Sequence, residues 1–186
     1  MFGKTCLPID RMKKLNLKRI VLIGFRGTGK STIGKLLAKK LEWKYLSTDQ
    51  QIEERVGTTI SDIVERKGWK YFRKLETQVI EKLKSSQNMI IDTGGGIVEN
   101  QKNVIQLNSS SLIVWIDAHI EDIIERLQKQ GNRPLLNKGD LVKDIKFNYG
   151  RRLKLYRQYS DLQFNTSIKE PDDICKTIVL EVLETK

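Results

Sequence analysis

The sequence predicts an α/β fold with a central parallel sheet of about five strands and helices on both of its faces. Short β-branched apolar runs alternate along the chain with longer segments whose apolar residues recur at helical spacing. Some of these runs, such as residues 112–116, are continuously apolar, which is typical of strands buried on both faces of a parallel sheet. In such sheets ligands bind beyond the carboxyl ends of the strands, so we expect the functional residues at that edge.

The expected elements follow one another in a regular order. Strands are predicted at residues 19–23, 43–47, 89–92, 111–116 and 162–166. Helices are predicted at residues 32–41, 50–55, 69–83, 98–107, 120–130, 141–159 and 171–183. Thr48 or Asp49 is the expected N-cap of the helix at 50–55, and Thr59 or Ser61 the expected cap of a further short helix that ends near residue 66. Gly57 and Gly68 are expected to interrupt this helical region.

A single domain is expected over residues 19–186, preceded by a basic extension over residues 1–18. The helical segment at about residues 49–86 is long for a simple crossover between two strands, so we expect it to form a lobe that holds a substrate. Residues 131–140 are polar and contain glycine and proline, which indicates a loop.

The basic composition has two explanations, solvated lysine side chains or a cleft that binds an anionic small molecule. The chain has 186 residues, 39% of them hydrophobic, and a formal net charge of +11. A cleft rich in Lys and Arg concentrates phosphates and carboxylates, and no basic motif with interleaved aromatic residues indicates nucleic acid. No apolar run approaches the roughly 20 residues of a membrane span, and Cys6 and Cys175 are too few for a disulfide framework or a metal site. We therefore expect a cytoplasmic protein that binds neither nucleic acid nor membrane.

A glycine-rich loop directly follows the first predicted strand. Residues 24–31, Gly-Phe-Arg-Gly-Thr-Gly-Lys-Ser, have the GxxxxGKS spacing of a P-loop and lead into a helical segment. The glycines let successive backbone N–H groups point at phosphate oxygens, and the N-terminus of the following helix favours the same anion. In this motif Lys30 reaches the β- and γ-phosphates, and the Ser31 hydroxyl binds Mg²⁺. The sequence therefore predicts a site for a nucleoside triphosphate that consists of Gly27, Thr28, Gly29, Lys30, Ser31 and Thr32.

Further motifs, in order along the chain, resemble those of the shikimate kinases. They are Thr48-Asp49 followed by Ile52-Glu53, Phe72-Arg73 with Glu76, Gly94-Gly95-Gly96, Arg133-Pro134-Leu135-Leu136, and Arg152 four residues before Tyr156. The resemblance covers residues 19–183. It implies a P-loop NTPase-like fold and transfer of the γ-phosphate of ATP to the 3-hydroxyl of shikimate. It also implies a Mg²⁺-dependent monomer that acts on the route to chorismate and the aromatic amino acids.

The resemblance also implies roles for residues around the predicted site, with Lys30, Asp49 and Arg133 as the catalytic residues. Arg73 and Arg152 clamp the carboxylate of shikimate, since planar guanidinium groups bind a carboxylate in a way that lysine does not reproduce. Asp49 orients the attacking hydroxyl or acts as its general base. Arg133 belongs to a mobile lid over residues 131–140 that closes over the phosphates. The remaining implied contacts are with the substrate for Gly94, Gly95 and Gly96, where any Cβ intrudes, with the adenine for Arg126 and Lys169, and with Arg73 for Glu76.

One position departs from the pattern of that family. The shikimate kinases usually have Asp two residues before Asp49, where its carboxylate helps hold the hydration shell of Mg²⁺, and this chain has Ser47. A neutral hydroxyl is a weaker partner for the water of a hard cation. Asp92 ends the predicted strand beside the P-loop, and it either supplies the missing carboxylate or caps the glycine turn. Under the first alternative, Ser31 and Asp92 form the metal site.

Two other functions remain open on the sequence. The first is a small P-loop kinase for another acceptor, such as a nucleoside monophosphate or gluconate, and the triple glycine with Arg73 and Arg152 favours a carboxylated acceptor instead. The second is a kinase-like nucleotide-binding protein with weakened or lost catalysis, which Ser47 motivates. Lys30 and Asp49, with Ser31 and Arg133, argue against it.

Overall fold

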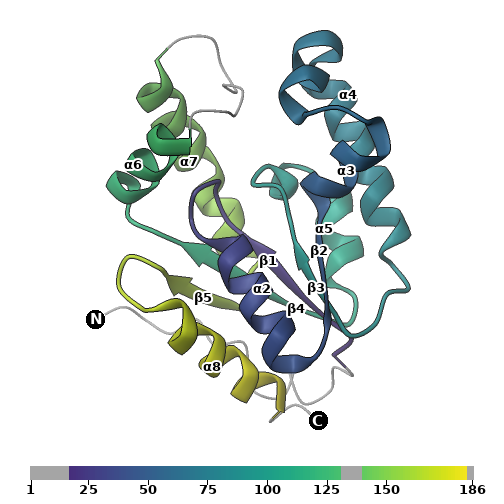
Figure 1. The fold of residues 1–186 in the computed structure, drawn as a ribbon, viewed down its shortest axis with the longest axis vertical. Coiled ribbons are helices and arrows are strands. Elements are labelled where there is room, and N and C mark those ends of the chain that lie inside the picture. The colour runs from purple at the N-terminus through teal and green to yellow at the C-terminus, as the bar shows by residue number, and fades with distance from the viewer. Residues whose placement is uncertain (1–16, 131–139, 184–186) are drawn as a thin grey trace.

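The structure, a computed structural model, describes residues 17–130 and 140–183 (Figure 1). The described residues form a five-stranded sheet with the order β2-β3-β1-β4-β5, and every strand pair is parallel. The strands are β1 (Arg19–Ile23), β2 (Lys44–Ser47), β3 (Met89–Asp92), β4 (Ser111–Asp117) and β5 (Leu162–Asn165). The predicted α/β fold class with its parallel sheet is therefore confirmed.

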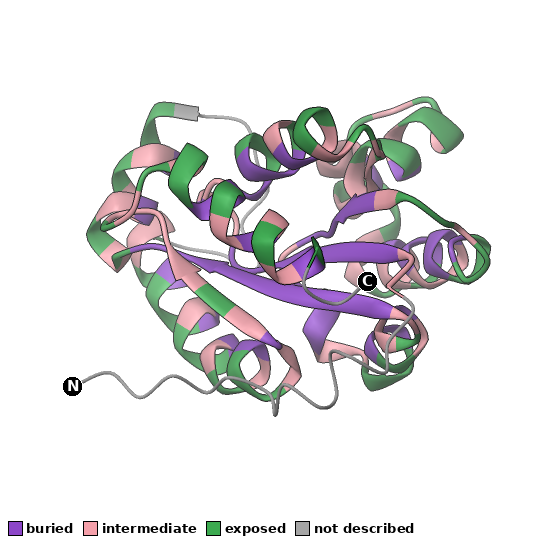
Figure 2. Ribbon diagram, turned by 90° about the horizontal axis from the view of Figure 1, so that it is seen from below, coloured by how far each residue is buried: buried purple, intermediate pink, exposed green. Residues whose placement is uncertain are grey.

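Helices cover both faces of this sheet, as predicted. They are α2 (Lys30–Leu41), α3 (Thr48–Val56), α4 (Ile60–Lys82), the 3₁₀ helix η1 (Ile97–Glu99), α5 (Gln101–Asn108), α6 (Ile120–Gln130), α7 (Leu141–Tyr159) and α8 (Pro171–Leu183). Alternate side chains of β1 belong to different apolar clusters, since successive residues of a strand point to opposite faces. Ile20 and Leu22 pack with residues of α2 and α8, whereas Val21 and Ile23 pack with residues of α4, α5 and α7. Figure 2 shows that the central strands are buried along their length, while β2 and β5 at the edges are more exposed.

The helical segment between β2 and β3 is divided where the glycines predict it. Gly57 ends α3 with a φ of 74°, and Gly68 interrupts α4 with φ 75° and ψ 167°. These are conformations that glycine adopts without a steric penalty. Thr59 caps α4 by accepting a hydrogen bond from the backbone of Asp62. The N-cap of α3 is Ser47, which accepts a hydrogen bond from the backbone of Gln50, so the expectation of Thr48 or Asp49 was wrong by one or two residues.

The single helix predicted over residues 98–107 was also wrong. The chain forms η1 and α5 instead, separated by Asn100 in an extended conformation with φ −108° and ψ 98°. The Asn100 side chain accepts a hydrogen bond from the backbone N–H of Lys102 and so caps α5. An asparagine side chain competes well with helical backbone hydrogen bonding, and for that reason it favours caps over helix interiors.

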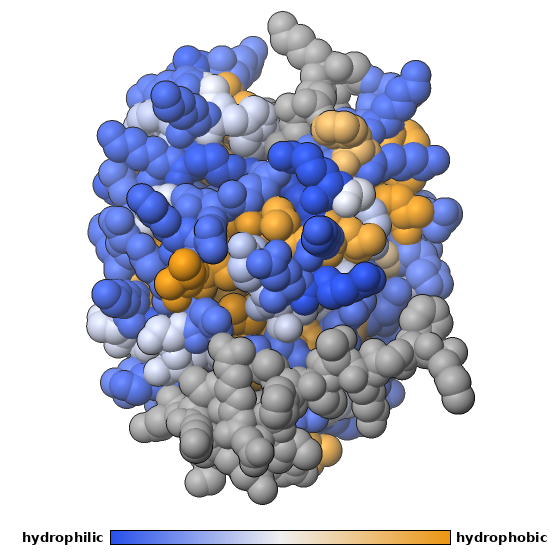
Figure 3. Space-filling model, turned by 180° about the vertical axis from the view of Figure 1, so that it is seen from behind, coloured by the Kyte–Doolittle hydropathy of each residue, from blue (hydrophilic) through white to orange (hydrophobic). Residues whose placement is uncertain are grey.

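The surface agrees with the composition of the chain. Figure 3 shows hydrophilic side chains over most of one face, with hydrophobic side chains exposed between them near its middle. Within the described ranges, no helix is both long and apolar enough to cross a membrane.

Candidate active site

The predicted P-loop connects the carboxyl end of β1 to the N-terminus of α2. Gly24, Gly27 and Gly29 have φ values of 143°, 80° and 91°, which side chains rarely tolerate. At Gly24 a Cβ would also lie 2.1 Å from the backbone oxygen of Ile116 in β4. The carbonyl of Phe25 accepts hydrogen bonds from Thr28 Oγ1 at 2.8 Å and Lys30 Nζ at 2.9 Å. The P-loop is therefore curled around the carbonyl group of Phe25, and α2 begins directly after the loop, at Lys30.

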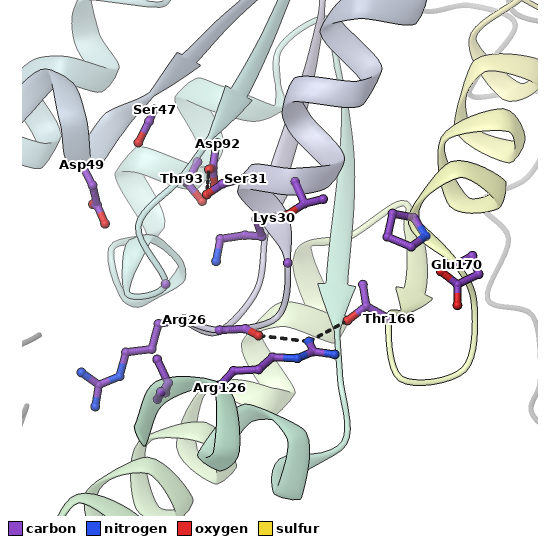
Figure 4. Close-up of a pocket in the computed structure, with 16 residues that line it drawn as sticks. Arg26, Lys30, Ser31, Ser47, Asp49, Asp92, Thr93, Arg126, Thr166 and Glu170 are labelled. Atoms are coloured by element: carbon purple, nitrogen blue, oxygen red, sulfur yellow. Dashed lines mark hydrogen bonds between the residues drawn. The ribbon is translucent and has the colours of Figure 1, made fainter. Parts of the chain in front are cut away.

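A cavity of about 550 Å³ opens beside this loop (Figure 4). Of the residues expected at the nucleotide and the metal, the cavity is lined by Gly27, Gly29, Lys30, Ser31, Thr32, Asp92 and Arg126. Thr28 is fully buried within the loop instead. The Lys169 ammonium donates to Thr177 Oγ1 of α8 at 2.8 Å, and Lys169 is absent from the residues that line the described cavity. Arg133, and with it residues 131–139 of the expected lid, lies outside the described residues.

Arg126 connects α6 to the P-loop and to the end of β5. Its Nη1 donates to the carbonyl of Gly27 at 3.2 Å and to Thr166 Oγ1 at 3.1 Å (Figure 4). Thr166 Oγ1 in turn donates to the carbonyl of Thr28 at 3.0 Å. The end of β5 and the guanidinium group thus hold the glycine loop at the base of the cavity.

Asp92 lies at the carboxyl end of β3, directly beside Ser31. Its Oδ2 accepts hydrogen bonds from Ser31 Oγ at 2.6 Å and from the Tyr45 hydroxyl at 2.9 Å, and the residue is 4% exposed. Burial and the neighbouring Asp92 raise the pKa of Tyr45, so the tyrosine remains a donor to the carboxylate. Ser47 is the register partner of Asp92 across β2 and β3, and both residues line the cavity (Figure 4).

A second, smaller cavity adjoins the first. It is lined by Arg26, Asp49, Ile60, Trp69, Phe72, Arg73, Gly94, Gly95, Gly96 and Arg152, and so contains every residue predicted to contact the acceptor substrate. Arg26, Asp49 and Gly95 line both cavities. The side chain of Arg26 is held by an ion pair with Asp144 of α7, with 3.1 Å between Nη2 and Oδ2. The two cavities therefore meet at the first turn of α3 and the start of the P-loop.

The glycine turn after β3 makes room for protein side chains. A Cβ at Gly94 would lie 2.6 Å from Asp49 Oδ1, and a Cβ at Gly96 would lie 1.9 Å from Arg73 Nη2. The hydroxyl of Tyr156 donates to the carbonyl of Gly95, which fixes the middle of the turn to α7. The absence of Cβ atoms at the turn therefore places Asp49 and Arg73 against its backbone.

Arg73 is oriented by a buried carboxylate on its own helix. Its Nη1 donates to Glu76 Oε1 at 2.9 Å and Oε2 at 3.0 Å, and Glu76 is fully buried. Burial raises the pKa of Glu76 to about 7, and the positive charge of Arg73 opposes this increase. Glu76 thus fixes one edge of the Arg73 guanidinium group, and Arg73 lines the second cavity.

Comparison with known proteins identifies the family. The family model described as shikimate kinase matches residues 26–183 of the chain. The chain belongs to the shikimate kinase family. It is 39% identical to the shikimate kinase of Persephonella marina over 163 residues, which cover 88% of this chain and 98% of that protein. It is 40% identical over 163 residues to the shikimate kinase of Caldicellulosiruptor bescii, with 88% and 94% covered. The structure of a shikimate kinase from Acinetobacter baumannii in complex with shikimate has a TM-score of 0.85 at 30% identity, covering 96% of this chain and 99% of that chain.

Some residues at the site of this family member were not found from the sequence. Thr166, Glu170 and Pro171 line the large cavity, and Arg26 lines both cavities. The position of Thr166 as the last residue of a predicted strand is the one signal that indicates it, because strand ends in a parallel sheet meet at the ligand edge. Arg26 occupies a variable position of the P-loop motif, and the motif assigns it no role.

Proposed function

We propose that this chain transfers the γ-phosphate of ATP to the 3-hydroxyl of shikimate, giving shikimate 3-phosphate on the route to chorismate and the aromatic amino acids. The observation that carries the proposal is that a P-loop cavity adjoins a cavity with paired arginines, and that the two share Asp49. Phosphoryl transfer needs a donor and an acceptor held in line, and adjoining cavities with a common wall meet that need.

The second cavity fits a small carboxylated polyol. Arg73 and Arg152 come from α4 and α7 and both line it, so that two guanidinium groups are near an entering carboxylate. Asp49 lines both cavities and accepts hydrogen bonds from ring hydroxyls of the acceptor. The same proposal assigns Asp49 to orienting the attacking 3-hydroxyl and to accepting its proton as the phosphoryl group is transferred.

Lys30 and the P-loop backbone are assigned to the triphosphate. The Lys30 ammonium donates to the carbonyl of Phe25 at the base of the loop, from where it reaches an entering β- or γ-phosphate. Lys30 is 8% exposed, so its charge is poorly screened by water and acts strongly on a phosphate in the cavity. Arg126 lies at the loop and is assigned to the adenine side of the nucleotide, together with Lys169, and Arg133 to the phosphates in a lid over residues 131–140.

Mg²⁺ is part of the proposal, and the residues present fit it. A buried carboxylate that accepts a hydrogen bond from the P-loop serine is a suitable donor set, because Mg²⁺ is usually bound by one or two protein groups together with phosphates and water. Ser31 and Asp92 would hold it. When bound, the ion would neutralise charge on the β- and γ-phosphates. Asp92, whose neighbour across the sheet is Ser47, thus supplies the carboxylate that this family usually has on β2.

The remaining expectations belong to the same proposal. Residues 19–186 act as one kinase domain, with residues 49–86 as the substrate-binding insertion, and the protein works as a cytoplasmic monomer. Light scattering after size-exclusion chromatography tests the oligomeric state.

A coupled assay tests the activity. With ATP, Mg²⁺ and each of shikimate, quinate, gluconate and nucleoside monophosphates, turnover is expected with shikimate above the other acceptors. Turnover only with another acceptor would overturn the substrate assignment. Nucleotide binding without turnover of any acceptor would favour the kinase-like binding protein.

A further inference from the structure

Glu99 contacts both arginines of the second cavity, although neither the P-loop motif nor the triple glycine includes it. Its Oε2 lies 3.1 Å from Arg152 Nη2 and 3.4 Å from Arg73 Nη2. Its Oε1 contacts Arg151 Nη2. Glu99 ends η1, Arg73 belongs to α4, and both other arginines belong to α7, so one carboxylate connects three separate elements.

The Glu99 carboxylate contacts the two arginines but does not line the second cavity. Arg73 and Arg152 line the second cavity, whereas Glu99 is not among its lining residues. Glu99 is a partly buried group with 22% of its side chain exposed, and the side chain of Arg152 is 4% exposed, so their charges are only partly screened by water. Arg152 Nε is buried, and no group in the described ranges accepts a hydrogen bond from it. Glu99 thus takes one Nη group of Arg152, while the Arg152 side chain still lines the second cavity.

The structure assigns Glu99 a role in specificity: it holds Arg73 and Arg152 as a pair and offsets their charge, so that the site accepts a monovalent carboxylate and discriminates against divalent anions. This inference rests on the proposed function, because it takes the second cavity as the acceptor site. Without Glu99, less negative charge would offset the guanidinium groups of Arg73, Arg151 and Arg152. A cluster with such an excess of positive charge favours phosphate or sulfate over a carboxylate.

The size of the effect follows from Coulomb's law. A ligand carboxylate on the far side of the two arginines would lie about 6 Å from Glu99. Because the guanidinium groups between the two anions offset part of their repulsion, we use an effective dielectric constant of about 40 to 80, at which the repulsion weakens binding about three- to tenfold. The interaction energy scales with the product of the charges, so a divalent anion in the same place is weakened by about the square of that factor. The discrimination therefore grows with the charge of the ligand.

Glu99→Gln tests this inference, because glutamine keeps the size of the side chain and one acceptor oxygen but removes the charge. We expect KM for shikimate and its dissociation constant to fall by about three- to tenfold. We expect sulfate, measured as a competitor of shikimate with ADP present to fill the P-loop, to bind more tightly by about the square of the observed factor. Asp173→Asn is the matched control, since Asp173 is an exposed ion-paired carboxylate on α8, and both ligands should bind to that variant as to the unmodified protein.

Three outcomes are distinguishable. A purely structural role for Glu99 would raise KM in Glu99→Gln together with a lower thermal midpoint, and this result would overturn the inference. Unchanged affinities for both anions would overturn it as well. If the unmodified protein fails to phosphorylate shikimate, the proposed function is wrong, while calorimetric titration of shikimate and sulfate still shows whether Glu99 weakens anion binding.

Discussion

Replacing Asp92 by asparagine should raise the Mg²⁺ requirement of the enzyme while leaving the shikimate site unaltered. The change removes one negative charge and keeps an oxygen that can accept from both Ser31 Oγ and the Tyr45 hydroxyl, which lie 2.6 and 2.9 Å from the carboxylate. Groups that orient a metal ligand typically contribute ten- to hundredfold to metal affinity. We therefore expect the half-saturating concentration of free Mg²⁺ to increase by about ten- to hundredfold, or about 1.4 to 2.7 kcal/mol.

The assay is the initial rate as a function of free Mg²⁺ at saturating ATP and shikimate. KM for shikimate, measured at saturating Mg²⁺, should be unchanged, because Asp92 lines the P-loop cavity and is not among the residues that line the second one. Circular dichroism and the thermal midpoint show whether the variant is folded, since Asp92 is 4% exposed. A folded variant with an unchanged Mg²⁺ dependence would refute the assignment of Asp92 to the metal, and the carboxylate would then be a structural partner of Ser31.

A second change tests whether the carboxylate has moved between strand ends. Ser47→Asp in the Asp92→Asn background returns a carboxylate to the register partner of Asp92 on β2, about 5 Å away in a parallel sheet. Aspartate caps a helix as well as serine does, so α3 should keep its N-cap. The double variant should recover most of the Mg²⁺ affinity. A double variant no better than Asp92→Asn alone would show that the two strand ends are not equivalent at the metal.

The other predictions address the acceptor site, a buried titratable group and the opposite end of the sheet. Gly96→Ala should raise KM for shikimate by about ten- to hundredfold, with KM for ATP nearly unchanged, because φ of −95° suits alanine while its Cβ would displace the Arg73 guanidinium. Glu76→Gln should flatten the pH dependence of stability measured by urea unfolding. Burial raises the pKa of Glu76 from 4.5 to about 7. The protonated side chain therefore contributes its full stability below pH 4.5, and this contribution is lost as the pH rises through about 7. The flattening should amount to about 3 kcal/mol. Arg19→Leu should lower the free energy of unfolding by about 2 to 4 kcal/mol, because Arg19 is 2% exposed and its Nη1 donates to the carbonyls of Leu83 and Lys84.

The fold could be predicted from the sequence because its central strands are apolar on both faces and glycines mark the ends of several connections. The predictions at residues 19–23 and 89–92 match β1 and β3 to the residue, and Gly57 and Gly68 mark the breaks in the helical insertion. The failure at residues 98–107 has a local cause. Asn100 is the C-cap of η1 and the N-cap of α5, yet the segment contains no glycine or proline, and its apolar spacing fits a single helix.

The candidate site divides into a part that local motifs specify and a part that tertiary packing creates. A P-loop needs only a strand, a glycine loop and a helix that are adjacent in sequence, so Lys30 and Ser31 were predictable as a unit. Glu99 meets Arg73 from α4 and Arg152 from α7, and no local pattern relates three positions so far apart in the chain. The proposal that Asp92 replaces a carboxylate at position 47 depends on the strand order, because Ser47 and Asp92 are neighbours only when β2 pairs with β3.

The triple glycine lines the second cavity, and the structure gives its missing Cβ atoms a different physical reason from the one that the motif suggests. A motif of this kind is expected to bring backbone N–H groups close to a ligand, where a Cβ would collide with the ligand itself. Here the added Cβ atoms of Gly94 and Gly96 would first meet Asp49 and Arg73, the side chains assigned to the acceptor. Those side chains come from α3 and α4, so the missing Cβ atoms let the helical insertion approach the end of β3. Under the proposed function, the turn therefore acts on substrate recognition through the positions of the residues that pack on it, and a substitution there should raise KM for shikimate.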